Sequence, residues 1–203
     1  MTDFHFYEPA SGHGLPHDPM NAIVGPRPIG WISSESADGV RNLAPYSFFS
    51  LFNYRPPIIG FSSIGWKDSV RNINETREFV WNLATRAQAE EMNASSAMVG
   101  PEVDEFTLAG LETLPSRIVA PPRVAGSPVH LECRATQVLR LENKEGAAID
   151  TWMVLGEVVG VHIDPALLDD GIYQTARARP ILRAGGPADY FELGEMFRMA
   201  RPQ

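Results

Sequence analysis

One short segment carries residues that could bind an anion. Lys67 and Ser69 lie around the start of a predicted helix, and Asn72 follows one turn later. Proteins hold a phosphate group with backbone N–H groups at a helix N-terminus, with hydroxyl groups and with a cation, and this segment supplies such groups. An ordinary interpretation stays open, in which Lys67 is solvated and a hydroxyl caps the helix. The residue types alone therefore indicate either a phosphate anchor or a plain helix start.

Polar side chains also occur on two predicted strands upstream, at positions where a purely apolar core strand would have none. The strands cover residues 23–33 and 40–48, and Asp38-Gly39 between them predicts a hairpin. Trp31 could form one wall of a slot for a flat aromatic ring, and neighbouring polar groups could meet the edges of that ring. These groups are Ser33, Asn42, Ser47, Ser62 and the backbone N–H groups near Ala44. The alternative is that Trp31 is ordinary core and that Asn42 and Ser47 satisfy turn backbone.

The histidines and the cysteine of the sequence do not predict a metal site or a hydrolytic site. His13 and His17 have a helical metal-ligand spacing, but they lie in a Gly- and Pro-containing arm without a Glu partner at the right place. His130 is predicted to be a partly buried strand residue with a hydrogen bond. Cys133 falls on an apolar face and is predicted to be inert core. No spacing supports a serine–histidine–acid arrangement, so a hydrolase has no positive evidence.

The rest of the pattern predicts a β-rich fold. Seventeen prolines and seventeen glycines are typical of turn-rich β proteins. Further strands are predicted over residues 58–62, 78–84, 129–133 and 151–163, the 78–84 strand being half-buried. Short helices are predicted over residues 67–75, 86–97 and 102–109, with one helical turn over 48–54. About six strands with few helices fit a closed or partly closed antiparallel barrel.

Composition limits the class of protein. A chain of 203 residues predicts one domain, and we expect an arm over residues 1–19, the domain over 20–195 and a tail over 196–203. The net charge of −8 argues against a nucleic-acid partner, because no basic surplus neutralises phosphates. A single cysteine favours a reducing, cytoplasmic compartment. Neither a signal peptide nor a membrane span is predicted.

The ordered set of these segments resembles the flavin reductase-like family, whose fold is a split β-barrel that binds FMN. Order and spacing agree from about residue 20 to about residue 190. The matching stretches are residues 27–33, 42–49, 56–57 with the following strand, 67–69 with 72–73, 78–83, 103–106 with 109–111, and 156–159. The family often has Thr where this chain has Ser33 and Ser69, and a hydroxyl is kept at both. Arg77 stands where a Gly is common.

The resemblance implies an FMN oxidoreductase with NAD(P)H as co-substrate. The flavin would carry the chemistry, so no catalytic side chain is assigned. The acceptor would be free flavin, a partner oxygenase or a small molecule. No Gly-x-Gly-x-x-Gly fingerprint follows a strand, so nicotinamide would stack transiently over the ring. The implied cofactor-binding residues are Trp31, Ser33, Asn42, Ala44, Ser47, Ser62, Lys67, Ser69 and Asn72, with Arg27, Arg77, His162 and Tyr190 as further site-lining candidates.

Several expectations stay open at this stage. Lys67, Arg27 or Arg77 could stabilise the reduced flavin, and the sequence does not select one of them. The family is typically homodimeric, and the aromatic residues Phe48, Phe49, Phe52 and Tyr54 could form an interface or part of the core. An alternative function is an FMN-binding electron carrier without its own NAD(P)H site. A third is a split-barrel protein for another ligand, such as a deazaflavin or haem.

Overall fold

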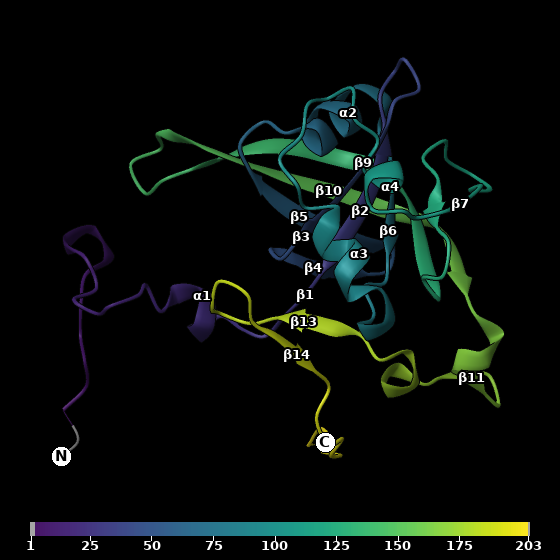
Figure 1. Cartoon of the computed structure of the whole chain (residues 1–203). Helices are drawn as coiled ribbons and strands as arrows, with labels where there is room; N and C mark the ends of the chain where they lie inside the picture. Colours follow the sequence, from purple (N-terminus) through teal and green to yellow (C-terminus); the bar gives the residue numbers. More distant parts are fainter. Residues whose placement is uncertain (1–2, 203) are drawn as a thin grey trace.

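A curled antiparallel sheet forms the centre of the computed structural model, which describes residues 3–202 (Figure 1). Its seven strands follow the order β3-β2-β6-β9-β10-β5-β4. Their bounds are β2 (Gly30–Glu35), β3 (Arg41–Tyr46), β4 (Phe49–Tyr54), β5 (Pro57–Ile64), β6 (Glu78–Asn82), β9 (Val129–Glu142) and β10 (Ala148–Ile163). The ring centroids of Tyr46 on β3 and Phe61 on β5 lie 4.5 Å apart. Strands from opposite sides of the sheet order therefore meet, and the expected antiparallel, partly closed architecture is confirmed.

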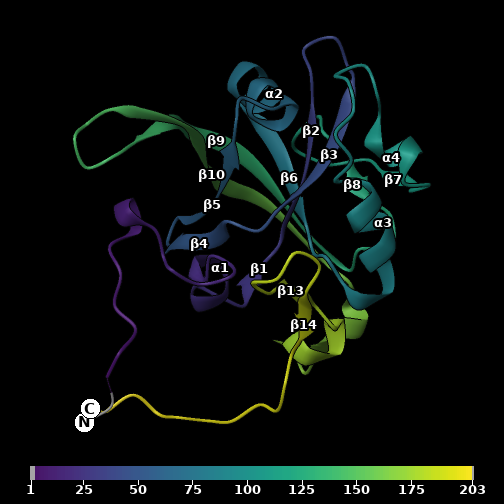
Figure 2. The same ribbon diagram turned by 60° about the vertical axis from the view of Figure 1, so that its left-hand side comes forward.

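Smaller elements cover the ends and one side of this sheet. The helices are α1 (Met20–Ile23), α2 (Asp68–Thr76), α3 (Ala89–Ala94) and α4 (Glu105–Leu108), with 3-10 turns at Pro9–Ser11, Arg86–Gln88, Pro165–Leu167 and Thr175–Ala178. A three-stranded sheet contains β1 (Arg27–Pro28), β13 (Ile181–Arg183) and β14 (Tyr190–Glu192); two-stranded ribbons pair β7 (Thr113–Leu114) with β8 (Arg123–Val124) and β11 (Leu168–Asp169) with β12 (Ile172–Tyr173). Figures 1 and 2 both show α2 at one end of the large sheet and the β13–β14 hairpin at the other.

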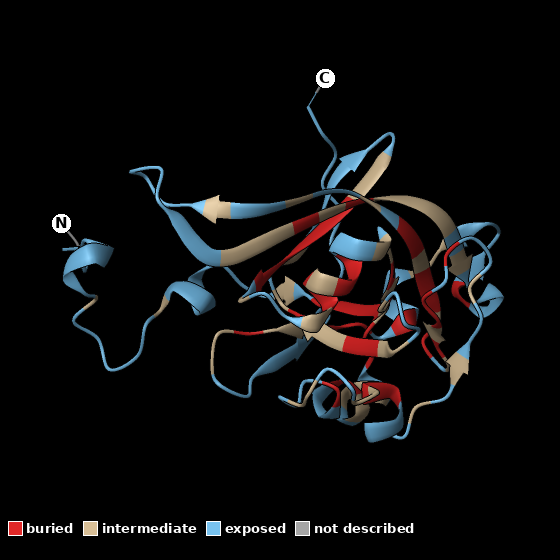
Figure 3. Ribbon diagram, turned by 90° about the horizontal axis from the view of Figure 1, so that it is seen from above, coloured by how far each residue is buried: buried red, intermediate tan, exposed pale blue. Residues whose placement is uncertain are grey.

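The core lies inside the curl of the sheet. Ile32, Phe61, Phe79 and Val154 form one buried cluster. The buried segments, drawn in red, lie at the centre of the sheet in Figure 3. A second cluster lies under α3 and α4 and contains Trp31, Leu43, Met92 and Phe106. The N-terminal segment, the tip of the β9–β10 hairpin and the C-terminal segment are exposed. Among residues 3–202 no helix is long and apolar enough to cross a membrane.

A close approach explains one glycine of the longest strand. Gly156 lies on β10 opposite β9, where the register between the two strands shifts. A Cβ atom at this position would lie 2.4 Å from Cε1 of Phe79. Residue 156 therefore lets the sheet bend closely around a core aromatic ring.

Three local predictions are wrong. The segment predicted as a helical turn over 48–54 contains β4, because its backbone pairs with β5 and its aromatic residues suit a strand. The segment 23–33 is not one strand, since Ile23 ends α1 and the strands begin at Arg27 and Gly30. The strand over 78–84 is not half-buried: Val80 and Asn82 are as inaccessible as Phe79, because the curl of the sheet covers one face of β6 and the segment that contains β8 covers the other.

Candidate functional site

A cavity of about 430 Å³ lies where the start of α2 faces β3. The segment after α3 and the first residue of α4 close its other sides. Four predicted site residues, Asn42, Ala44, Lys67 and Ser69, line this cavity. Its volume is in the range of ordinary small-molecule sites. The structure therefore brings together part of the set that the sequence indicated.

The N-terminus of α2 gives one wall of the cavity the character of an anion site. Lys67 is the N-cap residue, its backbone is extended, and its side chain makes no capping bond to the first turn. The only acid of that turn, Asp68, is paired with Arg71. The positive end of the helix dipole, free N–H groups and the Lys67 ammonium thus share one wall.

A buried hydrogen-bond network joins this wall to β3. The Asn42 side-chain amide donates to Oγ of Ser69 at 2.8 Å and to Oγ of Ser34 at 3.2 Å. The Asn72 amide donates to the same Ser34 oxygen at 3.3 Å. Because Ser69 Oγ accepts from Asn42, its own O–H is available as a donor. Asn42 and Asn72 therefore hold the helix start in position, and Asn72 does so from behind the cavity.

Two buried polar atoms near the cavity have no partner among residues 3–202. They are the hydroxyl of Tyr46, which lines the cavity, and Oδ1 of Asn72. Burial raises the pKa of Tyr46, and its hydroxyl lies close to Ser69 and Ser63 without a hydrogen bond of ordinary geometry. An unpartnered buried hydroxyl costs free energy that a polar ligand group can recover. Tyr46 is therefore a candidate ligand contact that the sequence did not single out.

Glu105 at the start of α4 also lines the cavity and was not identified as a site residue from the sequence. It is 5% exposed, and its Oε2 accepts a hydrogen bond of 3.0 Å from the N–H of Leu43. Burial raises the pKa of Glu105, and the carboxylates of Asp68 and Asp104 add to this effect, although the Leu43 hydrogen bond opposes it. Glu105 thus keeps its proton to a higher pH than a solvated glutamate does.

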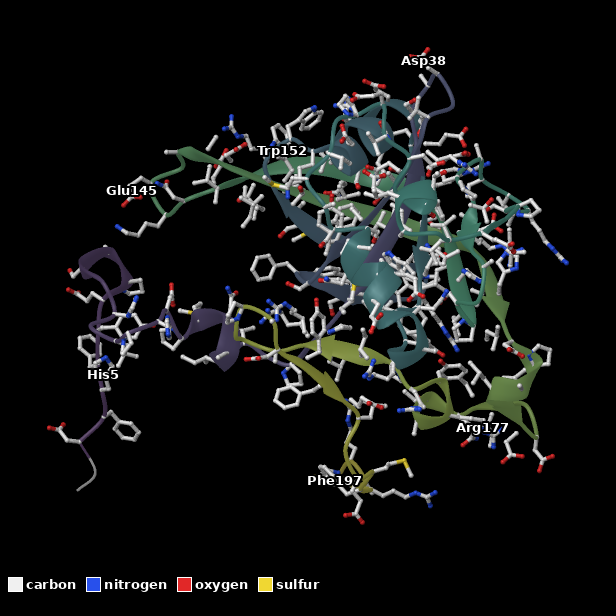
Figure 4. The ribbon with its side chains drawn as sticks, viewed as in Figure 1. His5, Asp38, Glu145, Trp152, Arg177 and Phe197 are labelled. Atoms are coloured by element: carbon white, nitrogen blue, oxygen red, sulfur yellow. The ribbon has the colours of Figure 1, made fainter. Side chains whose placement is uncertain are left out.

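An aromatic pair stands at the rim. Trp66 lines the cavity, and its ring lies 4.4 Å from that of Trp152, centroid to centroid, in an edge-to-face arrangement. Figure 4 labels Trp152 where the β9–β10 hairpin leaves the body of the protein. The indole nitrogen of Trp152 is buried without a hydrogen-bond partner among residues 3–202. The pair is 86 positions apart in sequence (152 − 66), so no local pattern could have predicted it.

Other predicted site residues lie outside this cavity. Trp31 is fully buried, and its indole N–H donates to Oγ of Ser95, so it supports the segment after α3 from behind. Ser33 is fully buried and donates to the carbonyl of Pro122. Ser62 on β5 and Ser47 in the turn before β4 do not line it either. For Trp31 the core alternative describes the structure better than a slot wall.

The two candidate arginines lie in different places. Arg27 donates to the carbonyl of Ser47 and lies over the ring of Phe48, beside a separate cavity of about 560 Å³. Arg77 follows the last residue of α2, and the helix separates it from Lys67 by about 15 Å. Its φ of 63° is left-handed, which explains why glycine suits this position. Lys67 is thus the one cation of the three that lines the main cavity.

His162 and Tyr190 each line another cavity. Tyr190 lies under the guanidinium of Arg183 and shares a cavity of about 680 Å³ with Gly185 and Gly186. His162 shares a different cavity with His130. Neither residue lines the cavity at the start of α2.

Comparison with known proteins gives a consistent result. The sequence model of the flavin reductase-like domain matches residues 24–182. An uncharacterized protein of Halalkalibacterium halodurans is 36% identical over 183 residues, which cover 87% of this chain and 86% of that protein. Nitrilotriacetate monooxygenase component B from Bacillus cereus is similar in structure, with a TM-score of 0.82 and 29% identity over 89% of this chain and 90% of that one.

A further solved structure bears on the fold. It is a protein with a split barrel domain from Shewanella frigidimarina. The TM-score is 0.80 at 21% identity, and the match covers 90% of each chain. The curled antiparallel sheet is therefore a split β-barrel, which confirms the expected fold class.

Proposed function

The chain belongs to the flavin reductase-like family, and from this premise we propose that it is an FMN-dependent oxidoreductase. It would take hydride from NAD(P)H and pass electrons to free flavin, a partner oxygenase or a small acceptor. The observation that carries the proposal is the cavity at the start of α2, where an ammonium group, an uncapped helix N-terminus and a buried hydroxyl converge.

These groups fit the phosphate end of FMN. Lys67 would neutralise part of its charge, and the first N–H groups of α2 would donate to its oxygens. Ser69 would add its free O–H, which its bond from Asn42 leaves available. The unpartnered hydroxyl of Tyr46 is a further donor within the cavity. This set is what a dianionic phosphate and a ribityl chain require.

The bound flavin would supply the hydride and electron chemistry. Residues of this chain would position it and exclude water. Trp66 presents an aromatic surface at the cavity rim, next to Trp152. Glu105 carries a carboxyl whose pKa is raised by burial, so it can hold a proton in the cavity wall. No other side chain needs to react.

The surface of β4 supports a homodimer. β4 lies at the edge of the large sheet, and its side chains Leu51, Phe52 and Tyr54 are 56%, 55% and 72% exposed. These side chains therefore belong to the surface and not to the core. An exposed apolar edge strand is a common site of subunit contact. Elution at the monomer mass in gel filtration would contradict this part of the proposal.

A partner oxygenase is supported as one acceptor. The similar protein from Bacillus cereus is component B of a nitrilotriacetate monooxygenase. That likeness concerns most of both chains, so the present chain could also supply reduced flavin to an oxygenase component. Its substrate need not be the same, since substrate choice in such a system belongs to the oxygenase.

The decisive experiment is anaerobic reduction of FMN. Purified protein is titrated with FMN while flavin fluorescence is followed, and NADH or NADPH is then added without air. We expect saturable binding and bleaching of the flavin absorbance faster than in a protein-free control. Stoichiometric FMN binding without bleaching by either nucleotide would instead select an electron carrier that is reduced by a protein partner. Absence of FMN binding would exclude both functions.

A further inference from the structure

A second polar cavity lies at the end of the barrel near β7, away from α2. Its volume is about 510 Å³, and it lies between the start of β9, the end of β10 and the segments around β7 and β8. It shares no lining residue with the cavity at the start of α2. Figure 1 shows α2 at the top of the large sheet and β7 to its right. The FMN proposal does not use this cavity.

His162 is held in this cavity by a buried carboxylate. Its Nε2 lies 2.5 Å from Oε1 of Glu132, which is fully buried and also accepts from the N–H groups of Arg117, Ile118 and Val119. A carboxylate only accepts, so Nε2 of His162 carries the proton. Nδ1 makes no hydrogen bond to any of residues 3–202, and in the neutral ring it presents a lone pair.

His130 is fixed in the same way by an amide. Its Nδ1 lies 2.8 Å from Oδ1 of Asn82. That oxygen also accepts from the N–H of Val124, and the Asn82 NH₂ group donates to the carbonyl of Trp31, so the amide orientation is settled. Nδ1 of His130 is therefore the protonated nitrogen. Burial, with Arg123 nearby, lowers the pKa of His130 to about 4, so Nε2 has a lone pair at neutral pH.

The charges around the two rings select the kind of ligand. The ring centroids are 6.1 Å apart. Arg117 and Arg123 also line the cavity, and neither forms an ion pair within residues 3–202. Asp164 is the one carboxylate among the described lining residues, and its Oδ1 caps a 3-10 turn through Ala166. Two guanidinium groups therefore face one carboxylate among the described lining residues, and the buried Glu132 carboxylate lies behind the ring of His162.

We propose that this cavity binds a protonated phosphate group, either inorganic phosphate or a phosphomonoester. The guanidinium groups of Arg117 and Arg123 would pair with its negative oxygens. The free nitrogens of His130 and His162 would accept hydrogen bonds from its O–H groups. A ligand that is both anionic and a hydrogen-bond donor can contact both the guanidinium groups and the free ring nitrogens of this cavity.

A metal ion fits the cavity less well. Metal-binding imidazoles often have their second nitrogen fixed by an acceptor, as both rings have here. However, no group of three possible metal-binding side chains occurs among the described residues. Two guanidinium groups at the same cavity would also repel a cation. Arg123 donates two hydrogen bonds to the carbonyl of Pro115, but a purely structural role for the Glu132–His162 pair explains neither Arg117 nor the free ring nitrogens.

The test is a titration with inorganic phosphate at pH 7 and with FMN at saturating concentration. The imidazole Cε1–H signals are monitored by NMR during the titration. We expect the signals of His130 and His162 to shift saturably, and those of His5, His13 and His17 to stay in place. Glycerol 2-phosphate and inorganic phosphate are also titrated in parallel at about pH 6, where a phosphomonoester still keeps part of its O–H, and this comparison distinguishes an ester ligand from inorganic phosphate. Sulfate, which has no O–H at this pH, should bind about tenfold more weakly than phosphate.

Matched variants distinguish phosphate binding in this cavity from phosphate binding at other cationic side chains. Arg117→Met should weaken phosphate binding about tenfold, and the substitution keeps the backbone N–H that Glu132 accepts. Lys144→Met removes the same charge from an exposed hairpin turn and should leave phosphate binding unchanged. Lys67→Met should also leave it unchanged, since Lys67 lines the other cavity. Unshifted His130 and His162 signals, or equal affinity for sulfate, would overturn the proposal whether or not the protein binds FMN.

Discussion

The side-chain amide of Asn42 donates a hydrogen bond of 2.8 Å to Oγ of Ser69 and thereby joins β3 to the first turn of α2. Both residues are buried, and both line the same cavity. The bond fixes the start of the helix against a strand of the barrel. It also determines the direction in which the Ser69 hydroxyl can donate, because its oxygen is already engaged. Positioning of the helix and orientation of a candidate ligand group thus depend on one contact.

Replacement of Ser69 tests this contact. Ser69→Ala removes the acceptor of the Asn42 amide and the free O–H together, so we expect FMN affinity to fall about tenfold and the free energy of unfolding to fall by about 1–2 kcal/mol. Flavin fluorescence titration and urea denaturation measure the two effects. Ser69→Thr keeps the hydroxyl and should keep most of the affinity. Equal FMN affinity in Ser69→Ala and the wild type would remove Ser69 from the site.

Lys67 gives a second prediction, which concerns salt. Lys67→Met should weaken FMN binding about tenfold at low ionic strength, because one charge-assisted contact to phosphate is lost. Added salt should weaken FMN binding to the wild type more than to this variant, since screening acts on the contact that the variant lacks. Lys144→Met has the same change of charge in an exposed turn and serves as the control. Parallel salt dependences in Lys67→Met and the wild type would argue against a phosphate at the start of α2.

Local sequence patterns predicted the elements whose conformation depends mainly on residues close in sequence. The helix expected over residues 67–75 occurs at Asp68–Thr76, and the strand expected over residues 151–163 occurs at Ala148–Ile163. The segment 48–54 was misjudged because short apolar runs do not distinguish a helical turn from a strand. Its conformation is decided by pairing with β5, in which Phe49 lies opposite Phe61. That contact is not local in sequence.

The site was predicted in part for a related reason. Lys67 and Ser69 at the helix start could be identified from the sequence. Glu105 and Trp66 could not, because they reach the cavity from segments that only the fold brings together. Trp31 was misplaced because β2 is buried on both faces, from Gly30 to Ser34, so side-chain alternation does not indicate which face a ligand meets. Glu105 follows Asp104 at a helix start, a pattern that resembles an exposed cap.

Glu105 provides a prediction on pH. Burial raises the pKa of Glu105 in the folded state, so the native protein binds more protons than the unfolded chain between the ordinary value near 4.5 and the raised one. The stability that this group contributes is complete below the ordinary pKa and is lost as the pH rises through the raised pKa. Glu105→Gln keeps an acceptor for the N–H of Leu43 and should therefore gain stability relative to the wild type as the pH rises.

Urea denaturation at a series of pH values measures this difference. Glu145→Gln, in the exposed turn of the β9–β10 hairpin, is the matched control and should show no comparable relative gain. A pH-independent difference between Glu105→Gln and the wild type would show that the Glu105 proton is not linked to folding. Glu105→Gln also tests the role of this side chain in FMN binding. FMN affinity should change little if the Glu105 carboxyl is only a neutral part of the cavity wall.

The contribution of Glu132 to the stability of the fold has the opposite pH dependence. Burial alone would raise the pKa of Glu132, but the hydrogen bonds from the N–H of Arg117, from His162 and from the next two N–H groups outweigh burial and lower the pKa to about 2. The unfolded chain therefore binds more protons than the native protein as the pH falls below about 4.5. The stability that Glu132 contributes is complete above that value and is lost as the pH falls towards 2.

Replacement of this carboxylate should be costly at neutral pH. Glu132→Gln places an NH₂ group among the N–H donors of residues 117–119 and His162, so we expect a loss of about 3 kcal/mol in the free energy of unfolding at pH 7. The loss relative to the wild type should shrink as the pH falls below about 4.5, because protonation then weakens the wild-type contacts as well. Glu142→Gln, at the exposed end of the same strand, is the control. A loss that stays constant in urea denaturation down to about pH 3 would mean that packing, and not the charged hydrogen bonds, makes Glu132 important for stability.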